Sequence, residues 1–139
     1  MTFVHSIRVR YGEVDAQGAV FNAHWLAYFD DAMTLFFDHL GFPPKETFTG
    51  RGTFDSMLVH AVIDWKGPAG FDDVIRIAVR PVRLGTSSFD LRHSAEVEGK
   101  PACEATITYV SVKPGGLEPQ PIPELFRAKL EAAMDEDPG

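Results

Sequence analysis

One long, strongly apolar helical pattern restricts the fold of this chain more than any other feature. Between Ala23 and Leu40, large apolar side chains recur at steps of three and four residues, which is the period of an α-helix. Asn22 is suited to cap the start of this helix, and Gly41 to end it. The apolar arc is unusually wide, so we expect a largely buried helix. Its apolar positions are Trp25, Leu26, Phe29, Ala32, Met33, Phe36, Phe37 and Leu40.

Five strand patterns accompany this helix. One precedes it, and the others follow a predicted loop at residues 45–54, joined by short turns that are typical of antiparallel neighbours. Pro81 cannot donate to a strand ladder, so it marks a bulge or an edge position. A shorter helix is expected at residues 121–135, before an acidic tail at 136–139 that we expect to fray. The expected strands are Phe3–Tyr11, Ser56–Lys66, Asp73–Leu84, Ser88–Glu98 and Ala102–Val112.

The arrangement of these elements predicts an α+β fold. One long apolar helix would lie against one strongly curved antiparallel sheet, with the short C-terminal helix beside them. We expect a single domain over residues 1–139. A sheet of this kind leaves edge strands unpaired, and pairing with a second copy would cover them. Self-association is therefore expected.

The charge and the cysteine content argue against several classes of protein. The formal net charge of −7 and the pI near 5.1 disfavour nucleic-acid binding, which needs a basic surface. The sequence has no run of about 18 apolar residues and no apolar leader, so we expect neither a membrane span nor a signal peptide. Cys103 is the single cysteine, which excludes an intrachain disulfide. We expect a soluble, cytoplasmic protein.

A lone carboxylate, that of Asp15, stands shortly before the long helix in the stretch RVRYGEVDAQGAVFNAHW. Backbone N–H groups at the start of a helix are unpaired and lie at the positive end of its dipole. Taken alone, Asp15 is most simply a turn or capping acid. A carboxylate beside such N–H groups can also serve in acyl transfer, as a general base or a nucleophile next to an oxyanion site.

The element order and the segment YGEVDAQGAVFNAHWLAYFDDA together resemble the hotdog-fold acyl-CoA thioesterases, and among them the 4-hydroxybenzoyl-CoA thioesterase-like group. In that fold the curved sheet wraps around one long central helix. Later landmarks that fit are HLGFPP, PAGFDDVIRI and LGTSSFDLRHSAEV, so the resemblance extends to Val112. The signature is formed here by Tyr11, Glu13, Asp15, Gly18, Val20, Phe21 and Asn22, with Trp25 at the usual aromatic position.

This resemblance implies a hydrolase that converts an acyl-CoA thioester to the free acid and CoA. In this family two protomers pair their sheets edge to edge and many members form tetramers, so a homodimer or homotetramer is implied. The acyl-CoA lies along the dimer interface, and each site uses residues of both chains. CoA enters as part of the substrate, and no cofactor is implied. A short or aromatic acyl group is favoured over a long fatty chain, because the 4-hydroxybenzoyl-CoA thioesterase-like enzymes favour such substrates.

The resemblance also assigns catalytic roles. Asp15 would act as general base or nucleophile. The oxyanion would meet backbone N–H groups around residues 21–23, with Asn22 as the main donor, and Gly18 would let the loop turn toward the ligand. Glu13 either faces the same site or is a solvated acid at a strand end.

Two further sets of residues are candidates for binding the substrate. Asp30 either reads a polar end of the acyl group or is an exposed helix acid, and Arg83 either meets a phosphate or belongs to a solvated strand face. A strand histidine such as His60 is more often structural. The expected acyl contacts are Phe21, Trp25, Asp30, Val59 and His60, and the expected CoA contacts are Arg83, Thr86, Ser87 and Ser88.

Two other functions stay open. A hotdog hydratase or dehydratase needs a histidine and an acid that converge on the acyl chain, and His24 is the candidate histidine. A non-catalytic module that binds an acyl or aromatic ligand is the other, since a fold does not determine a function. We expect neither a metal nor a nucleotide cofactor, because the histidines lack metal-site spacing and there is no P-loop or GxGxxG motif.

Overall fold

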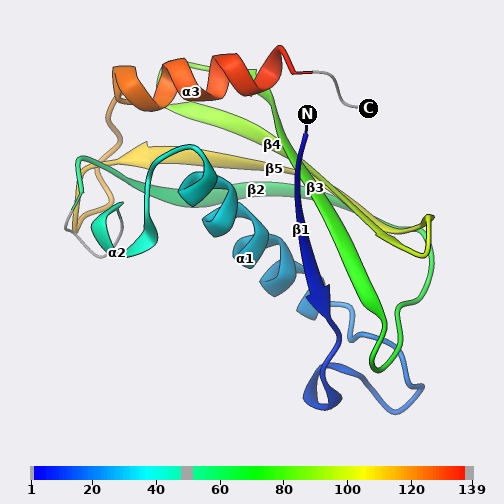
Figure 1. Cartoon of the computed structure of the whole chain (residues 1–139). Helices are drawn as coiled ribbons and strands as arrows, with labels where there is room; N and C mark the ends of the chain where they lie inside the picture. Colours follow the sequence, from blue (N-terminus) through cyan, green and yellow to red (C-terminus); the bar gives the residue numbers. More distant parts are fainter. Residues whose placement is uncertain (1, 48–51, 137–139) are drawn as a thin grey trace.

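A curved, five-stranded antiparallel sheet wraps around one long helix in the computed structural model, which describes residues 2–47 and 52–136 (Figure 1). The helix is α1 (His24–His39), and the strands lie in the order β1-β3-β4-β5-β2. The fold expected from the sequence is confirmed. The strands are β1 (Phe3–Arg8), β2 (Asp55–Trp65), β3 (Val74–Leu84), β4 (Ser88–Val97) and β5 (Lys100–Val112), and the other helices in the described ranges are η1 (Tyr11–Glu13), α2 (Pro44–Thr47) and α3 (Glu124–Met134).

The apolar face of α1 fills the concave side of the sheet, and α3 closes the core at one end. Phe126 of α3 is fully buried, with its ring centroid 4.9 Å from that of Phe37 and 4.6 Å from that of Phe54. Burying a side chain of this size stabilises the fold by about 2–3 kcal/mol. The wide apolar arc of α1 is thus accounted for by packing. The residues that α1 buries are Trp25, Tyr28, Phe29, Ala32, Phe36 and Phe37.

The segment around the start of α1 differs from the expectation in two places. β1 ends at Arg8, and the chain then forms one turn of 3₁₀-helix, Tyr11–Glu13, where the strand was expected to continue. α1 begins at His24 with Ala23 as its N-cap and no side-chain hydrogen bond at the cap. The predicted cap by the Asn22 side chain is therefore wrong, because the helix starts one residue too late for it.

Three other predicted segments differ in detail. The predicted loop at residues 45–54 contains α2, and residues 48–51 lie outside the described residues. The helix expected at 121–135 is α3, which starts after Pro123 because that proline takes the extended backbone of an N-cap. Of the predicted acidic tail, residues 137–139 lie outside the described ranges.

Pro81 lies on β3, which is an inner strand paired on both sides. The register against β4 shifts between Pro81 and Arg83, so the missing N–H donor falls at an irregularity in the ladder. The predicted bulge is confirmed.

β2 is an edge strand with an exposed apolar surface. It pairs with β5 on one side, and the register of that pairing shifts between Leu58 and His60. Val59, Val62 and Trp65 are 54%, 53% and 54% exposed. An unpaired apolar edge of 11 residues is a ready template for another strand.

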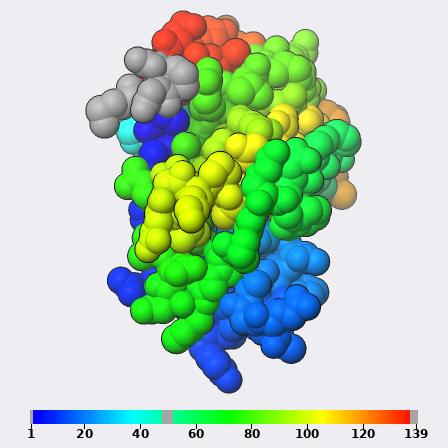
Figure 2. Space-filling view, turned by 90° about the vertical axis from the view of Figure 1, so that its right-hand side faces the viewer, coloured from blue at the N-terminus to red at the C-terminus, as the bar shows by residue number. Residues whose placement is uncertain are grey.

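The two ends of the sheet carry different connections. The β1–α1 connection packs on the β2–β3 connection, where the Val20 N–H donates to the Ala69 carbonyl at 2.8 Å and Ala19 forms a bridge with Gly70 (Figure 2). The β3–β4 turn lies at the opposite end, beside the start of α3, where Ile122 N–H donates to the Thr86 carbonyl at 2.9 Å. β3, with its 11 residues, separates the two ends by about 35 Å. No helix of the described ranges is both long and apolar enough to span a membrane.

Candidate functional site

A short hairpin leads into α1 and carries Asp15 near its tip. Its arms are joined by a hydrogen bond from the Phe21 N–H to the Glu13 carbonyl (3.1 Å) and by another from the Asp15 N–H to the Ala19 carbonyl (2.8 Å). We call residues 13–21 the Asp15 hairpin. It holds the predicted catalytic acid on the same short element as the residues that precede α1.

The Asp15 carboxylate has one oxygen engaged and the other free. Oδ1 accepts the N–H groups of Gln17 at 2.8 Å and Ala19 at 3.4 Å, whereas Oδ2 has no hydrogen-bond partner within residues 2–47 and 52–136. Gly18 donates its N–H to the Asp15 carbonyl and has a φ of +78°, which glycine adopts without strain. Asp15 therefore shapes the turn with one oxygen and can hold a water molecule with the other.

The backbone N–H groups next to the start of α1 are the candidate donors to an oxyanion. The Phe21 N–H is taken by the Glu13 carbonyl, so it cannot meet an oxyanion as the sequence led us to expect. The N–H groups of Asn22 and Ala23 donate to no acceptor among the described residues, and both residues are exposed. They lie at the positive end of the α1 dipole, where an anion is stabilised.

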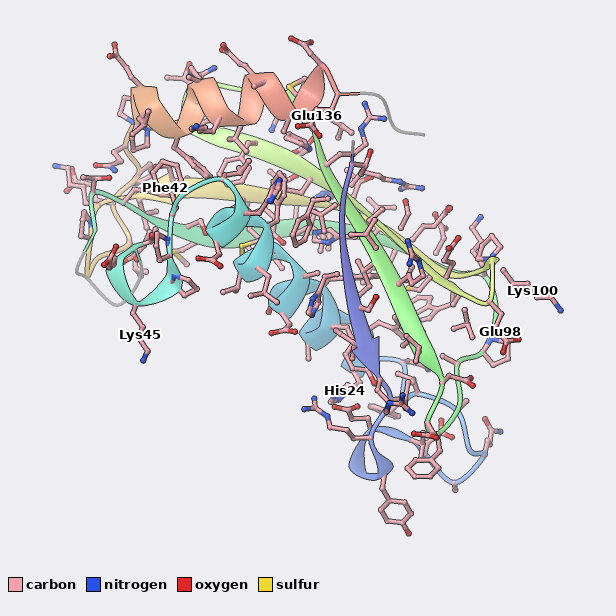
Figure 3. The ribbon with its side chains drawn as sticks, in the orientation of Figure 1. His24, Phe42, Lys45, Glu98, Lys100 and Glu136 are labelled. Carbon is pink, nitrogen blue, oxygen red and sulfur yellow. The ribbon has the colours of Figure 1, made fainter. Side chains whose placement is uncertain are left out.

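Glu13 is neither solvated nor free to act beside Asp15. It is 6% exposed, and its carboxylate accepts hydrogen bonds from Arg10 and from the Tyr28 hydroxyl, with His24 Nε2 at 3.2 Å. His24 lies at the lower end of α1 in Figure 3. Burial opposes ionisation of Glu13, but the hydrogen bonds from Arg10 and Tyr28 outweigh it and lower the pKa of Glu13 to about 2. Both expectations for Glu13 were wrong.

Asp30 lies halfway along α1 and lines a hollow of about 320 Å³ between α1 and the β2–β5 pair. Desolvation by the surrounding protein raises the pKa of Asp30, although its side chain remains accessible from outside. The Ser56 hydroxyl oxygen is buried there without a hydrogen-bond partner. The hollow thus combines an apolar wall with groups able to bind a hydroxyl. Its other lining residues are Met33, Thr34, Leu58 and Tyr109.

The other predicted acyl contacts do not gather in this hollow. Trp25 is 2% exposed and packs edge-to-face on Tyr28, so it is a core residue. Phe21 is 55% exposed beside the start of α1, and Val59 and His60 are exposed on the edge strand β2. Within one chain, the predicted acyl site is open toward the side where β2 lacks a neighbour.

The predicted CoA contacts lie at the end of the sheet away from the Asp15 hairpin. Arg83 donates to both Asp90 carboxylate oxygens, at 2.9 and 3.1 Å, and to the Ser88 hydroxyl at 2.9 Å. The carbonyls of Thr86 and Ser87 accept backbone N–H groups. One ligand could touch both Asp15 and these residues only if they came from two different chains.

The residues that sequence reasoning missed are the partners of Glu13. Arg10 stands three residues before Glu13, a spacing that allows an ion pair across one turn, but Tyr28 and His24 come from α1 and carry no such signal. No group of three or more histidine, cysteine or acidic side chains in the described ranges is placed to hold a metal ion.

Residues 9–130 match the family model of the thioesterase-like superfamily. The chain belongs to this superfamily. The match takes in the Asp15 hairpin, α1 and the sheet from β2 to β5. The family expected from the sequence is confirmed.

Individual thioesterases resemble the chain over nearly its whole length. The 1,4-dihydroxy-2-naphthoyl-CoA hydrolase of Synechococcus elongatus is 25% identical over 127 residues, covering 91% of this chain and 93% of that one. The acyl-CoA thioester hydrolase YbgC of Escherichia coli is 25% identical over 126 residues, covering 90% and 92%. The solved structure of the gentisyl-coenzyme A thioesterase BH1999 has a TM-score of 0.84, 27% identity and coverages of 92% and 99%. The expected enzyme class, a thioester hydrolase, is confirmed with the family.

Proposed function

We propose that this protein hydrolyses the thioester of an aromatic, hydroxyl-bearing acyl-CoA, with Asp15 as the catalytic carboxylate. The observation that carries the proposal is the free Oδ2 of Asp15 on the hairpin that leads to the free N–H groups of Asn22 and Ala23. A carboxylate that can take a proton and donors that can hold an oxyanion are the two parts that acyl transfer to water requires.

The reaction uses one water molecule. Asp15 takes a proton from this water molecule while the water oxygen attacks the thioester carbonyl carbon. The carbonyl oxygen then becomes an oxyanion. The Asn22 N–H donates to this oxyanion. One preorganised donor of this kind lowers the activation barrier by about 3 kcal/mol. The C–S bond then breaks, and the CoA sulfur leaves with the proton that Asp15 took from water. The products are the free acid and CoA. In the alternative route, Asp15 attacks the carbonyl directly and water opens the resulting anhydride.

The hollow at Asp30 supports a polar, aromatic acyl group. Its apolar wall suits a ring, while Asp30 and the unpartnered Ser56 hydroxyl suit a ring hydroxyl. The naphthoyl-CoA hydrolase and the gentisyl-CoA thioesterase, by their names, act on hydroxylated aromatic acyl groups. The chemistry needs no cofactor, because CoA arrives with the substrate.

A homodimer through β2 would complete the site. Antiparallel pairing of two β2 strands would extend the sheet across both protomers and cover the exposed Val59, Val62 and Trp65. Because the partner's β2 strand would run antiparallel to that of the first protomer, the partner's β3–β4 turn would point toward the Asp15 end of the first protomer. This arrangement would place Arg83 of one chain nearer the CoA of the other. Two such dimers could form a tetramer.

A cytoplasmic location fits this proposal. Cys103 is a buried free thiol, and burial raises its pKa to about 11, so it stays protonated and unreactive. The hydratase alternative is disfavoured, because the candidate His24 lines the hollow between β1 and α1 and not the hollow at Asp30, where we propose that the acyl group binds. A binding module without turnover would leave the free Asp15 oxygen unused.

A panel of acyl-CoAs tests the proposed activity. We would measure released thiol with benzoyl, hydroxybenzoyl, dihydroxybenzoyl, acetyl and palmitoyl thioesters of CoA. The proposal predicts the highest kcat/KM for the hydroxylated aromatic acyl groups. Stoichiometric binding without thiol release from any of them would favour the binding module and contradict the proposal.

A further inference from the structure

The Glu13 carboxylate joins the segment before the Asp15 hairpin to the first two turns of α1. One oxygen, Oε1, accepts the Arg10 backbone N–H at 2.8 Å and the Tyr28 hydroxyl at 2.9 Å. The other, Oε2, accepts the Arg10 guanidinium and lies 3.2 Å from His24 Nε2. Both oxygens are fully engaged, so Glu13 has no lone pair left for a water molecule or a substrate.

The backbone of the same residue closes the hairpin. The Glu13 carbonyl accepts the Phe21 N–H at 3.1 Å, and the next steps toward the tip are the Val14–Val20 bridge and the hydrogen bond from Asp15 to Ala19. Asn22, with its free N–H, directly follows Phe21. A shift of Glu13 would therefore be passed to both parts of the proposed machinery.

We propose that Glu13 is a positioning residue, whose buried carboxylate fixes the Asp15 hairpin against α1 so that Asp15 and the Asn22 N–H keep the relative placement that the reaction needs. The inference rests on the proposed function, since it needs Asp15 to be catalytic. Misplacing reacting groups by about 1 Å can lower a rate by on the order of 100-fold.

The role requires a carboxylate, because five polar contacts come from donors or possible donors on both sides of Glu13. A glutamine has nearly the same shape but offers one acceptor oxygen and one NH₂ donor. In Glu13→Gln, either the Arg10 backbone and Tyr28 or the Arg10 side chain and His24 would face that donor. Buried donors without acceptors displace the segments that carry them.

The matched control is Asp31→Asn. Asp31 is also on α1, and its carboxylate lies 3.0 Å from His5 Nε2, but its side chain is 58% exposed and contacts no part of the Asp15 hairpin that the structure describes. Both substitutions replace an acid beside a histidine with its amide. We expect kcat to fall about 10- to 100-fold in Glu13→Gln with KM changed less than about threefold, and to stay at the parent value in Asp31→Asn.

Hydrogen exchange gives a readout that does not depend on turnover. In Glu13→Gln the amides of Ala19 and Phe21, which exchange through local opening of the hairpin, should exchange at least about tenfold faster, while amides of β4 and β5, which open only with the whole fold, should speed up by no more than the change in the free energy of unfolding accounts for. A general loss of stability alone would speed exchange in the sheet and leave the local opening of the hairpin at its parent rate. Tyr28→Phe, which removes a single hydroxyl, should produce the same local effect at smaller size and covers the case in which Glu13→Gln does not fold.

The outcomes separate this inference from the proposed function. Parent kcat and parent exchange rates in folded Glu13→Gln, with Asp15→Asn inactive, would overturn the positioning role alone. Full activity of Asp15→Asn would overturn the proposed function, and the exchange rates would still decide whether Glu13 fixes the hairpin. A lower kcat together with faster local exchange of the hairpin amides supports the positioning role.

Discussion

The Glu13 carboxylate and the Tyr28 hydroxyl are hydrogen-bonded at 2.9 Å inside the protein. The bond joins the base of the Asp15 hairpin to the second turn of α1. Burial and this hydrogen bond raise the pKa of Tyr28 well above its ordinary value, because both disfavour the phenolate. Tyr28 therefore remains a donor over the whole working range of pH, and Glu13 remains an acceptor.

Glu13 should make the stability of the fold sensitive to acid. Its pKa is about 2 in the folded chain against an ordinary 4.5, so the ionised group stabilises the fold above about pH 4.5, and this contribution is lost as the pH falls toward 2. The contribution is on the order of 3 kcal/mol. We expect urea unfolding to show a large difference in the free energy of unfolding between the parent and Glu13→Gln at pH 7, and a much smaller one at pH 2.5. A difference that is the same at both pH values would contradict this prediction.

The exposed edge of β2 should be the dimer interface. Val62→Lys places a charge on a strand edge where Val62 is 53% exposed, and a buried lysine without a partner destabilises an interface. We expect light scattering to show a dimer or tetramer for the parent and a monomer for Val62→Lys, with activity lost in the monomer. The control is Leu125→Lys on α3, where Leu125 is 66% exposed, and it should keep the parent mass. A parent that is a monomer and fully active would refute the shared site.

Asp30 should select for hydroxylated acyl groups. In Asp30→Leu the hollow keeps its apolar wall and loses its charged acceptor, so the KM for a hydroxybenzoyl-CoA should rise about 10- to 100-fold, the effect of losing a hydrogen bond to a charged group. The KM for benzoyl-CoA should change little. The control is Asp31→Asn, at the next position of the helix, where the side chain is exposed. It should change neither KM. Equal effects of Asp30→Leu on both substrates would mean that Asp30 does not read the hydroxyl.

The sequence predicted most of the fold, because its elements have strong periodicity. The helix between Ala23 and Leu40 was expected within one residue of each end of α1, and the strands within about three residues of theirs. Pro81 was expected at a bulge or an edge position because it has no N–H to donate to a strand ladder, and the register shift next to it agrees with the first of these. These features depend on local patterns, which a single sequence displays.

The candidate site was less predictable, because it depends on contacts between distant residues. The sequence near Glu13 does not indicate that Tyr28 and His24 contact its carboxylate. An acid is buried only where the fold supplies partners for it, and these partners come from a distant segment. Asn22 is a favourable capping residue, yet the hairpin that pairs Phe21 with Glu13 delays the start of α1. The distance of Arg83 from Asp15 follows from the length of β3, which no motif records.

Replacement of Asp15 decides whether its carboxylate is catalytic. Asp15→Asn keeps an oxygen that can accept the Gln17 N–H, so the hairpin should stay folded while the side chain loses its ability to take a proton. Asp72→Asn is the control, since Asp72 lies on the adjoining β2–β3 connection, is exposed and contacts Arg8. With the acyl-CoA that the parent hydrolyses fastest, we predict a fall in kcat of about 100- to 10,000-fold for Asp15→Asn and none for Asp72→Asn. A folded Asp15→Asn protein with the parent kcat would show that Asp15 is only a turn residue.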